Sequence, residues 1–333
     1  MAQSRRREPS LYIGVDVGGT KVLAALVQST GEIVARHRCP TPRDASPEAT
    51  VEAIMQAMEG ALADQGLTSK ALKGIGLTIP GVVDPAAGHI VVTPNMNLTG
   101  ITIGPLVTQR FGVPVVIGND VNMGTLGEKW LGAARRARSA VGIMVGTGIG
   151  GGVIVDGKLV TGCREAAGEI GHMVVQIGGP QCGCGNYGCL EALASRTAIE
   201  RDIRQAIADG KQTLVEDLLK ETDGLVKSSV LRKALKAGDK VVTQIMQRAS
   251  EVLGYGCLTV RHLLDPDVIV LGGGVIEACG RFVLPIVRGI VASDALAGAR
   301  PGSYIAESER GDDAVVYGAV ALAMTECGED PSE

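Results

Sequence analysis

Residues 11–27 read Leu11-Tyr-Ile-Gly-Val-Asp-Val-Gly-Gly-Thr-Lys-Val-Leu-Ala-Ala-Leu-Val27. The apolar run that ends at Asp16 and the run at residues 22–27 have the composition of β-strands. The residues Gly18-Gly-Thr-Lys21 between them are typical of a tight turn. This stretch therefore predicts a hairpin of two strands joined by a glycine turn at the start of the fold.

A second stretch of the same kind begins at residue 140. Residues 140–145 and 153–155 are apolar runs, and Gly146-Thr-Gly-Ile-Gly-Gly-Gly152 lies between them. Asp156-Gly157 then has the signature of a two-residue hairpin turn. Two hairpins that each open a mixed α/β unit predict a duplicated α/β architecture, with a cleft between its halves where ligands usually bind.

The rest of the chain alternates between the two kinds of element. Further strands are expected at residues 31–37, 75–79, 113–117 and 267–271, and helices at residues 50–65, 198–208, 226–237, 241–264 and 314–324. We place the domain boundary between Asn122 and Trp130. This gives a smaller N-terminal α/β domain at residues 1–125, joined by the last helix near residues 313–326, and a larger α/β domain at residues 126–312.

The composition allows a sizeable core and excludes several classes of protein. Of the 333 residues 45% are hydrophobic but only 2% are aromatic, so aliphatic side chains and close glycine contacts must form the core. The net charge of −4 and the pI near 5.7 argue against a nucleic-acid-binding surface, despite three arginines at residues 5–7. No apolar run reaches the ~18 residues of a membrane span, and from the polar first ten residues we expect no secretory signal. We expect a cytoplasmic protein.

Potential metal ligands are concentrated in Glu169-Ile-Gly-His172 and, nine residues later, in Cys182-Gly-Cys184-Gly-Asn-Tyr-Gly-Cys189-Leu-Glu191. One imidazole and three thiolates form the Cys3His set that structural zinc prefers. Cys182 and Cys184 are poor disulfide partners because only one residue separates them. We predict a structural Zn²⁺ that holds a substrate loop in shape; the alternative is a chance cysteine-rich loop. No role is assigned to the other cysteines, Cys39, Cys163, Cys257, Cys279 and Cys327.

The glycine turn that begins at Gly146 has the G-x-G-x-x-G spacing of a dinucleotide-binding fold, but its context excludes that fold. A dinucleotide loop opens a helix, whereas these glycines lead into the strand at residues 153–155. The motif instead predicts a cradle in which the backbone N–H groups of Gly146, Thr147 and Gly148 surround a phosphate.

Three side chains in or just before the first glycine turn, Gly18-Gly19-Thr20-Lys21, are suited to bind a nucleotide. We expect Asp16 to hold Mg²⁺ through water, Thr20 to donate its hydroxyl to a phosphate and Lys21 to supply positive charge. The sequence G-x-x-x-x-G-K-[ST] is absent, which excludes a P-loop. Each turn alone also fits an ordinary hairpin. The two turns, together with Gly272-Gly273-Gly274 before a helix, favour nucleotide binding.

These motifs together closely resemble the ROK family of sugar kinases and sugar-responsive repressors. They follow the family's order from about residue 11 to residue 325, and the zinc motif is highly specific. The matching segments are Asp16-Val-Gly-Gly-Thr-Lys21, Ile79-Pro-Gly-Val-Val-Asp84, Asn119-Asp-Val-Asn122, Gly146–Gly152, Glu169–His172 and Cys182–Glu191. The resemblance implies an actin-like, hexokinase-type fold of two α/β domains around a central cleft. It also implies a homodimer or homotetramer.

The resemblance also implies a role for each matching position. Asp120 would be the general base that takes the proton of the attacking sugar hydroxyl; by itself, an Asp after a strand also fits a local turn. The sugar would bind to Asn119, Glu169, His172 and Glu191, with Gly81 and Asn95 or Asn97 lining the same pocket. The two glycine turns would hold the ATP phosphates, and Gly272, Gly273 and Gly274 the adenosine side. Phosphoryl transfer needs mainly such positioning and charge neutralisation.

The leading hypothesis is ATP-dependent phosphorylation of a hexose at its 6-hydroxyl, most simply of glucose to glucose 6-phosphate. Kinases for N-acetylmannosamine, N-acetylglucosamine or fructose remain alternatives, as does polyphosphate as the donor. The segment Asn97-Leu-Thr-Gly-Ile101 departs from the Asn-Leu-Pro-Gly-Trp-like stretch of many family kinases, which leaves the pocket wall and the sugar open. A sugar-sensing repressor is disfavoured because only fifteen residues precede Asp16, too few for a helix-turn-helix. Intact Asp120 and Lys21 disfavour an inactive sugar-binding protein.

Overall fold

The computed structural model of the chain describes residues 9–42, 46–94, 96–220, 222, 224–296, 298 and 304–331. The strands in this part of the chain are β1 (Leu11–Val17), β2 (Lys21–Gln28), β3 (Ile33–Pro40), β4 (Leu72–Ile79), β5 (Val82–Asp84), β6 (His89–Val92), β7 (Val115–Asn119), β8 (Ala140–Val145), β9 (Ile149–Val155), β10 (Lys158–Leu159), β11 (Val268–Gly272) and β12 (Tyr304–Glu307).

The helices are α1 (Pro47–Ala63), α2 (Ile103–Phe111), α3 (Asp120–Leu131), α4 (Leu190–Ala194), α5 (Arg196–Ala208), α6 (Val215–Lys220), α7 (Ser228–Lys236), α8 (Lys240–Leu264), α9 (Gly274–Ala292) and α10 (Asp313–Glu326). Two short 3-10 helices, η1 (Ser69–Ala71) and η2 (Ile170–His172), complete the elements of the described residues. None of the helices in these residues combines the length and the apolar character that a membrane crossing requires.

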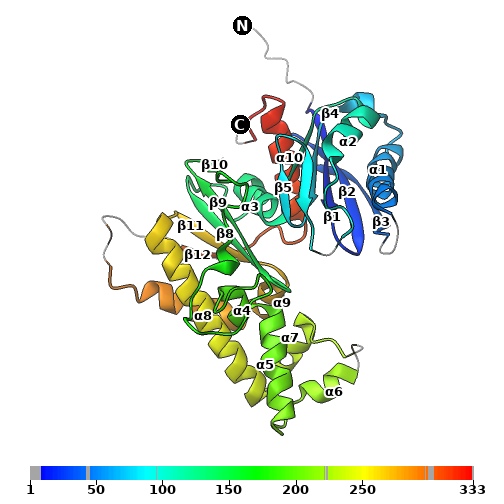
Figure 1. Ribbon diagram of the computed structural model, residues 1–333. Helices are drawn as coiled ribbons and strands as arrows, with labels where there is room; N and C mark the ends of the chain where they lie inside the picture. Colours follow the sequence, from blue (N-terminus) through cyan, green and yellow to red (C-terminus); the bar gives the residue numbers. More distant parts are fainter. Residues whose placement is uncertain are drawn as a thin grey trace. The chain divides into compact units, whose positions relative to one another are not determined.

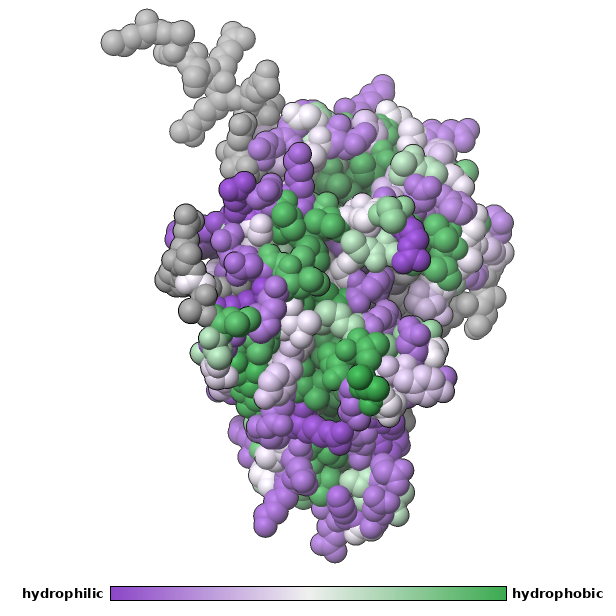
Figure 2. Space-filling view, turned by 60° about the vertical axis from the view of Figure 1, so that its left-hand side comes forward, coloured by the Kyte–Doolittle hydropathy of each residue, from purple (hydrophilic) through white to green (hydrophobic). Residues whose placement is uncertain are grey.

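Two compact units divide the chain. The first comprises the described residues up to Arg135, the segment Thr161–Ala166 and the residues from Asp312 onward. The second comprises Arg136–Val160 and Ala167–Gly311. In the first unit, α10 from the far end of the chain lies beside the N-terminal strands (Figure 1). In the second, hydrophilic residues dominate the end where α5, α6 and the start of α8 lie (Figure 2).

The sheet of the first unit has the strand order β3-β2-β1-β4-β7. β1 pairs with β2 in an antiparallel hairpin, whereas β1, β4 and β7 run parallel to one another. In register, Asp16 faces Thr78 across the β1–β4 pair, and Ile79 faces Asn119 across the β4–β7 pair. The carboxyl ends of these parallel strands therefore meet at one edge of the sheet, where α/β folds place functional side chains.

The sheet of the second unit repeats this arrangement, with the strand order β10-β9-β8-β11-β12. β8 and β9 form the antiparallel hairpin, and β11 adds in parallel on the other side of β8. The tight turn at Asp156 and Gly157 has φ of 51° and 79°, as a two-residue hairpin turn of this kind requires. The predicted duplication of a hairpin that opens an α/β unit is confirmed.

Glycines allow α10 to pack backbone against backbone in the first unit. A Cβ atom added to Gly14 of β1 would lie 2.6 Å from the carbonyl oxygen of Val316, and one added to Gly318 would collide with the carbonyl of Met123 in α3. One aromatic contact, between Trp130 and Tyr317, supports the same interface with ring centroids 5.9 Å apart. A core poor in aromatic residues thus gains its density from close backbone approach, as the composition predicted.

Candidate functional site

Asp16 and Asp120 lie close enough at the edge of the first sheet for their charges to interact. Asp16 is the penultimate residue of β1, and Asp120 follows β7 as the first residue of α3. Burial raises the pKa of Asp16 to about 6, and the negative charge of Asp120 adds to this shift, while Lys21 acts in the opposite direction. The fold therefore brings together two carboxyl groups that are 104 residues apart in the sequence.

Asn119 connects two of the predicted site residues through its side-chain amide. Its Oδ1 accepts hydrogen bonds from the N–H groups of Val121 (2.9 Å) and Asn122 (3.2 Å) and so caps α3. Its Nδ2 donates to the carbonyl oxygen of Gly81 at 2.9 Å. Gly81 has φ of +107°, and an added Cβ atom would collide with the carbonyl of Val92. The amide of Asn119 keeps one N–H for a further acceptor.

Because Asn119 supplies the cap, α3 does not depend on Asp120 for it. The N–H of Val121 also donates to Oδ1 of Asp120 at 3.0 Å. A carboxylate in the first turn of a helix is favoured by the helix dipole. Asp120 is thus held at the helix start and at the carboxyl end of β7, which is compatible with both the local role and the catalytic role considered for it.

A pocket of about 420 Å³ lies beside the first glycine turn, a size typical of small-molecule sites. It is lined by Gly19, Thr20, Thr41, Pro42, Pro80, Met96 and Asn97. Asn95, predicted to line the sugar pocket, lies outside the described residues. The turn itself is held by Thr41, whose Oγ1 donates to the carbonyl of Gly18 at 2.6 Å. Lys21 Nζ lies 3.9 Å from Oδ2 of Asp312, and both side chains are exposed.

His172, Cys182, Cys184 and Cys189 converge in the second unit, with ligand atoms that all lie within 4.8 Å of one another. The Sγ atoms of Cys184 and Cys189 are 3.8 Å apart, and Cys182 Sγ lies 3.6 Å from His172 Nδ1. A tetrahedral ion with bonds of about 2.3 Å to sulfur and about 2.0 Å to nitrogen would separate such pairs by about 3.8 and 3.6 Å. The four side chains therefore fit Zn²⁺.

The two acids that flank this cluster occupy different positions. Glu169 is exposed, and its Oε2 lies 3.8 Å from Nε2 of His172, the nitrogen that does not face Cys182. Glu191 belongs to α4 and is partly buried. The Sγ of Cys182 lies 3.5 Å from Oε1 of Glu191, whereas Oε2 accepts the N–H of Ile149 at 2.8 Å. Glu191 thus joins the cysteine cluster to the second glycine turn, a link that the sequence did not predict.

The second glycine turn is fixed from two sides. An added Cβ atom at Gly148 would collide with Oε2 of Glu191, so a larger residue there would displace this carboxylate. From α5, the N–H of Arg196 donates to the carbonyl of Gly146 at 3.0 Å, and Oγ1 of Thr197 donates to the carbonyl of Thr147 at 2.8 Å. Neither Arg196 nor Thr197 belongs to a recognisable motif, and sequence reasoning missed both.

The third glycine run lies beside the second glycine turn. Gly272 pairs in register with Met144 near the end of β8, and an added Cβ atom at Gly273 would lie 2.7 Å from the carbonyl oxygen of Val145. Gly273 has φ of +84°, and Gly274 begins α9. The two glycine segments predicted to hold the nucleotide in this unit are therefore neighbours at the carboxyl ends of β8 and β11.

Known proteins are similar to this chain over nearly its whole length. The model of the ROK family matches residues 12–326. A glucokinase from Halalkalibacterium halodurans is 32% identical over 308 residues, which cover 92% of this chain and 93% of that protein. A putative xylose repressor from Caldicellulosiruptor is 30% identical over 319 residues, which cover 95% of this chain and 78% of that protein.

Among solved structures, the chain is similar to a ROK family glucokinase from Streptomyces griseus in complex with glucose and AMPPNP. The two have a TM-score of 0.77 and 31% sequence identity, and the match covers 95% of this chain and 100% of that chain. The predicted α/β fold of the actin-like, hexokinase type is confirmed by this likeness.

Proposed function

The chain belongs to the ROK family, and from this premise we propose that it is an ATP-dependent kinase that phosphorylates the 6-hydroxyl of a hexose, with glucose as the acceptor. One observation supports the proposal most directly. The carboxyl group of Asp120 stands at the edge of the first sheet, near Asp16 and next to the amide of Asn119. A base, a cation-binding carboxylate and a hydrogen-bonding amide are the groups that phosphoryl transfer to a sugar requires.

In this reaction Asp120 accepts the proton of the sugar 6-hydroxyl. The hydroxyl oxygen forms a bond to the γ-phosphorus of ATP, and the bond from that phosphorus to the bridging oxygen breaks, which releases ADP. The remaining N–H of Asn119 binds a sugar hydroxyl and fixes the direction of attack. Gly81, whose carbonyl is tied to Asn119 at 2.9 Å, holds the pocket wall in place.

The donor is assigned to the glycine turns. Gly18, Gly19, Thr20 and Lys21 in the first unit, and Gly146, Thr147 and Gly148 in the second, bind the phosphates, while Gly272, Gly273 and Gly274 bind the adenosine side. Asp16 would hold Mg²⁺ through water, and its raised pKa fits this role because a nearby divalent cation would stabilise the charged carboxylate. Mg²⁺ supplies neutralisation of the phosphate charge when bound.

The second unit contributes Glu169, His172 and Glu191 as ligands for the sugar hydroxyls. Zinc held by Nδ1 of His172 and by Cys182, Cys184 and Cys189 would keep Nε2 of His172 directed away from the cluster. We take the two compact units as the two functional domains. We place the reaction in the cytoplasm, where ATP is present and cysteines remain reduced, and we expect a homodimer or homotetramer.

A coupled assay of ADP release tests this function. Wild type is assayed with Mg-ATP against glucose, fructose, mannose, N-acetylglucosamine and N-acetylmannosamine, beside Asp120→Asn. We expect glucose turnover that falls by about 10²- to 10⁴-fold in the variant, with a melting temperature that does not fall. Asp64→Asn is the matched control, because Asp64 lies in the same unit, is exposed and forms only a surface pair with His37.

Other outcomes assign a different function. Turnover with an N-acetylated sugar or fructose alone would keep the mechanism and change the acceptor, and turnover only with polyphosphate would change the donor. Full activity in Asp120→Asn would show that Asp120 is not the general base. Heat of sugar binding without turnover of any sugar by wild type would favour a sugar-responsive regulator, the activity named for the Caldicellulosiruptor relative.

A further inference from the structure

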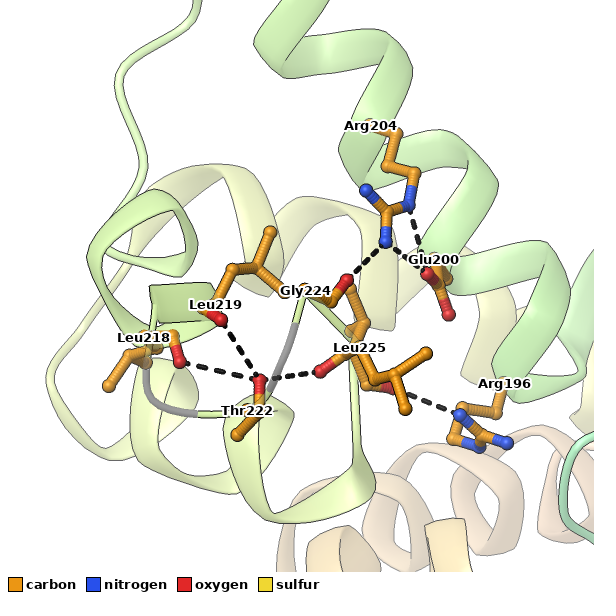
Figure 3. Close-up of polar contacts among 9 residues, drawn as sticks. Arg196, Glu200, Arg204, Leu218, Leu219, Thr222, Gly224 and Leu225 are labelled. Carbon is orange, nitrogen blue, oxygen red and sulfur yellow. Dashed lines mark hydrogen bonds and ion pairs between the residues drawn. The ribbon is translucent and has the colours of Figure 1, made fainter.

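Arg196 joins two segments of the second unit that are far apart in the sequence. It is the first residue of α5, and its guanidinium group is partly exposed. Nη2 donates to Oγ1 of Thr147 in the second glycine turn at 2.6 Å. Nη1 donates to the carbonyl of Val226, in the loop between α6 and α7, at 3.1 Å (Figure 3).

The loop between α6 and α7 has other supports besides Arg196. Arg204, two turns further along α5, donates from Nη2 to the carbonyl of Gly224 at 2.6 Å (Figure 3). Within the loop, Oγ1 of Thr222 donates to the carbonyl of Leu225 at 2.8 Å. The loop is therefore held in place by Arg204 and by its own hydrogen bonds, and the contact with Arg196 is an additional one.

The positive charge of Arg196 is not neutralised by the residues around it. In the described part of the chain, Arg196 forms no ion pair. The nearest acid on the same helix face, Glu200, accepts from both Nε and Nη2 of Arg204. A cation in the first turn of a helix is disfavoured by the helix dipole, and the cap is supplied by Ser195, whose Oγ accepts from Ala198 N–H at 3.2 Å. The two hydrogen bonds of Arg196 go to neutral oxygen atoms, so they leave its positive charge without a counter-ion among the described residues.

The surroundings of Arg196 point to a phosphate as its counter-ion. Thr147, its partner, lies in the middle of the glycine turn assigned to the ATP phosphates. The loop that Arg196 contacts continues into Ser228, and an added Cβ atom at Gly274 would lie 3.6 Å from Oγ of Ser228. Arg196 is thus hydrogen-bonded to one of the glycine segments assigned to the nucleotide, and to a loop that continues to the other. Two of its five N–H groups are used by Thr147 and Val226, which leaves three for a ligand.

We propose that Arg196 binds a phosphate group of the nucleotide directly and so selects nucleotides that carry two or more phosphates. The planar guanidinium group suits the geometry of phosphate oxygens, and charge-assisted hydrogen bonds of this kind are the stronger ones. The inference rests on the proposed kinase function, and it assigns to α5 a part in donor recognition that its sequence does not indicate.

Calorimetric titration with adenosine, AMP, ADP and AMPPNP, in the presence of Mg²⁺, tests the proposal on wild type, Arg196→Ala, Arg196→Lys and Arg204→Ala. We expect Arg196→Ala to weaken the binding of ADP and AMPPNP by about 10- to 100-fold, with adenosine affinity unchanged. Arg196→Lys keeps the positive charge but not the planar guanidinium group, so we expect it to recover part of the lost affinity for ADP and AMPPNP. Arg204→Ala, which loosens the same loop, leaves the affinity for ADP as in wild type.

Two results would overturn the inference. Wild-type affinity for ADP in Arg196→Ala would show that the arginine does not contact phosphate. An equal loss for adenosine and ADP, matched by Arg204→Ala, would show that it acts only by positioning the loop. A failure of the kinase function itself is distinguishable, because wild type would then bind none of the four nucleotides. The melting temperature of each variant shows whether it is folded.

Discussion

In the first unit, the charged form of Asp16 lowers the stability of the folded protein, because the carboxylate is buried and lies near another negative charge. Its pKa is raised from the ordinary value of 3.8 to about 6, first by burial and then by the charge of Asp120. Because the folded state binds this proton more tightly than the unfolded state, the contribution of Asp16 to stability is fully present below about pH 4. It is lost as the pH rises through about 6.

We therefore expect Asp16→Asn to increase stability while it removes activity. The amide carries no charge, so the free energy of unfolding rises by about 1 to 3 kcal/mol above pH 6, and this gain shrinks as the pH falls toward 4. Differential scanning calorimetry between pH 4 and pH 8 measures the effect, with Asp64→Asn as the control. A lower melting temperature of Asp16→Asn at pH 7.5 would contradict the assignment of a disfavoured charge at this position.

Among the elements, α10 shows most clearly how glycines replace large side chains. Gly318 of α10 faces the backbone of Met123 in α3, and Gly127 of α3 faces the backbone of Ala314 in α10. Neither contact leaves room for a Cβ atom, and a backbone carbonyl cannot rotate away as a side chain can. The distance between these two helices is thus set by glycine positions.

Gly318→Ala is expected to lower the free energy of unfolding by about 2 to 3 kcal/mol, because the new Cβ atom must push α10 and α3 apart. The matched control is Gly289→Ala in α9, where the structure leaves open space around the added atom. Alanine there stabilises the helix by about 0.5 to 1 kcal/mol. Thermal unfolding of both variants measures the difference, and equal shifts in the two would argue against close packing at Gly318.

The sequence analysis did not predict helix α3, because its residues have a weak local preference for helix. The boundary expected near residue 125 falls within α3, whose sequence contains Gly124 and Gly127 and therefore has a low intrinsic helix propensity. Its cap, Asn119, was interpreted only as a ligand for the sugar. The helix forms because its glycines allow close contact with α10, which is a tertiary effect.

At the scale of the whole molecule, the two units depend on different long-range connections. In the first, α10 returns from the end of the chain to cover β1 and β4. In the second, the Cys3His cluster holds η2 and α4 together, and Glu191 extends the connection to the glycine turn between β8 and β9. The loss of a metal should therefore affect the second unit first.

Removal of metal by a chelator is expected to lower the melting temperature and to weaken hexose binding by at least about tenfold, because His172 and Glu191 lose their support. Cys189→Ser should reproduce both effects, whereas Cys163→Ser, at an exposed cysteine outside the cluster, should change neither. Elemental analysis, calorimetry and sugar titration provide the measurements. A chelated protein that retained its full melting temperature and sugar affinity would exclude a structural metal.

The sequence by itself determined the repeated hairpins, the duplicated α/β architecture and the group of one histidine and three cysteines that could hold a metal. These features depend on composition and spacing within short segments, where a strand, a glycine turn or a cluster of cysteines is directly visible. It also pointed to the residues now proposed for catalysis and binding, through their resemblance to a family.

Only the tertiary structure decided how those residues are connected. Hydrogen bonds join residues that are far apart in the sequence: 38 positions separate Asn119 from Gly81, 42 separate Ile149 from Glu191, and 49 separate Arg196 from Thr147. No local pattern encodes such pairs, because each depends on where the sheets and helices place two distant segments of backbone. The roles of Glu191 and Arg196 at the second glycine turn therefore became apparent only after the chain was folded.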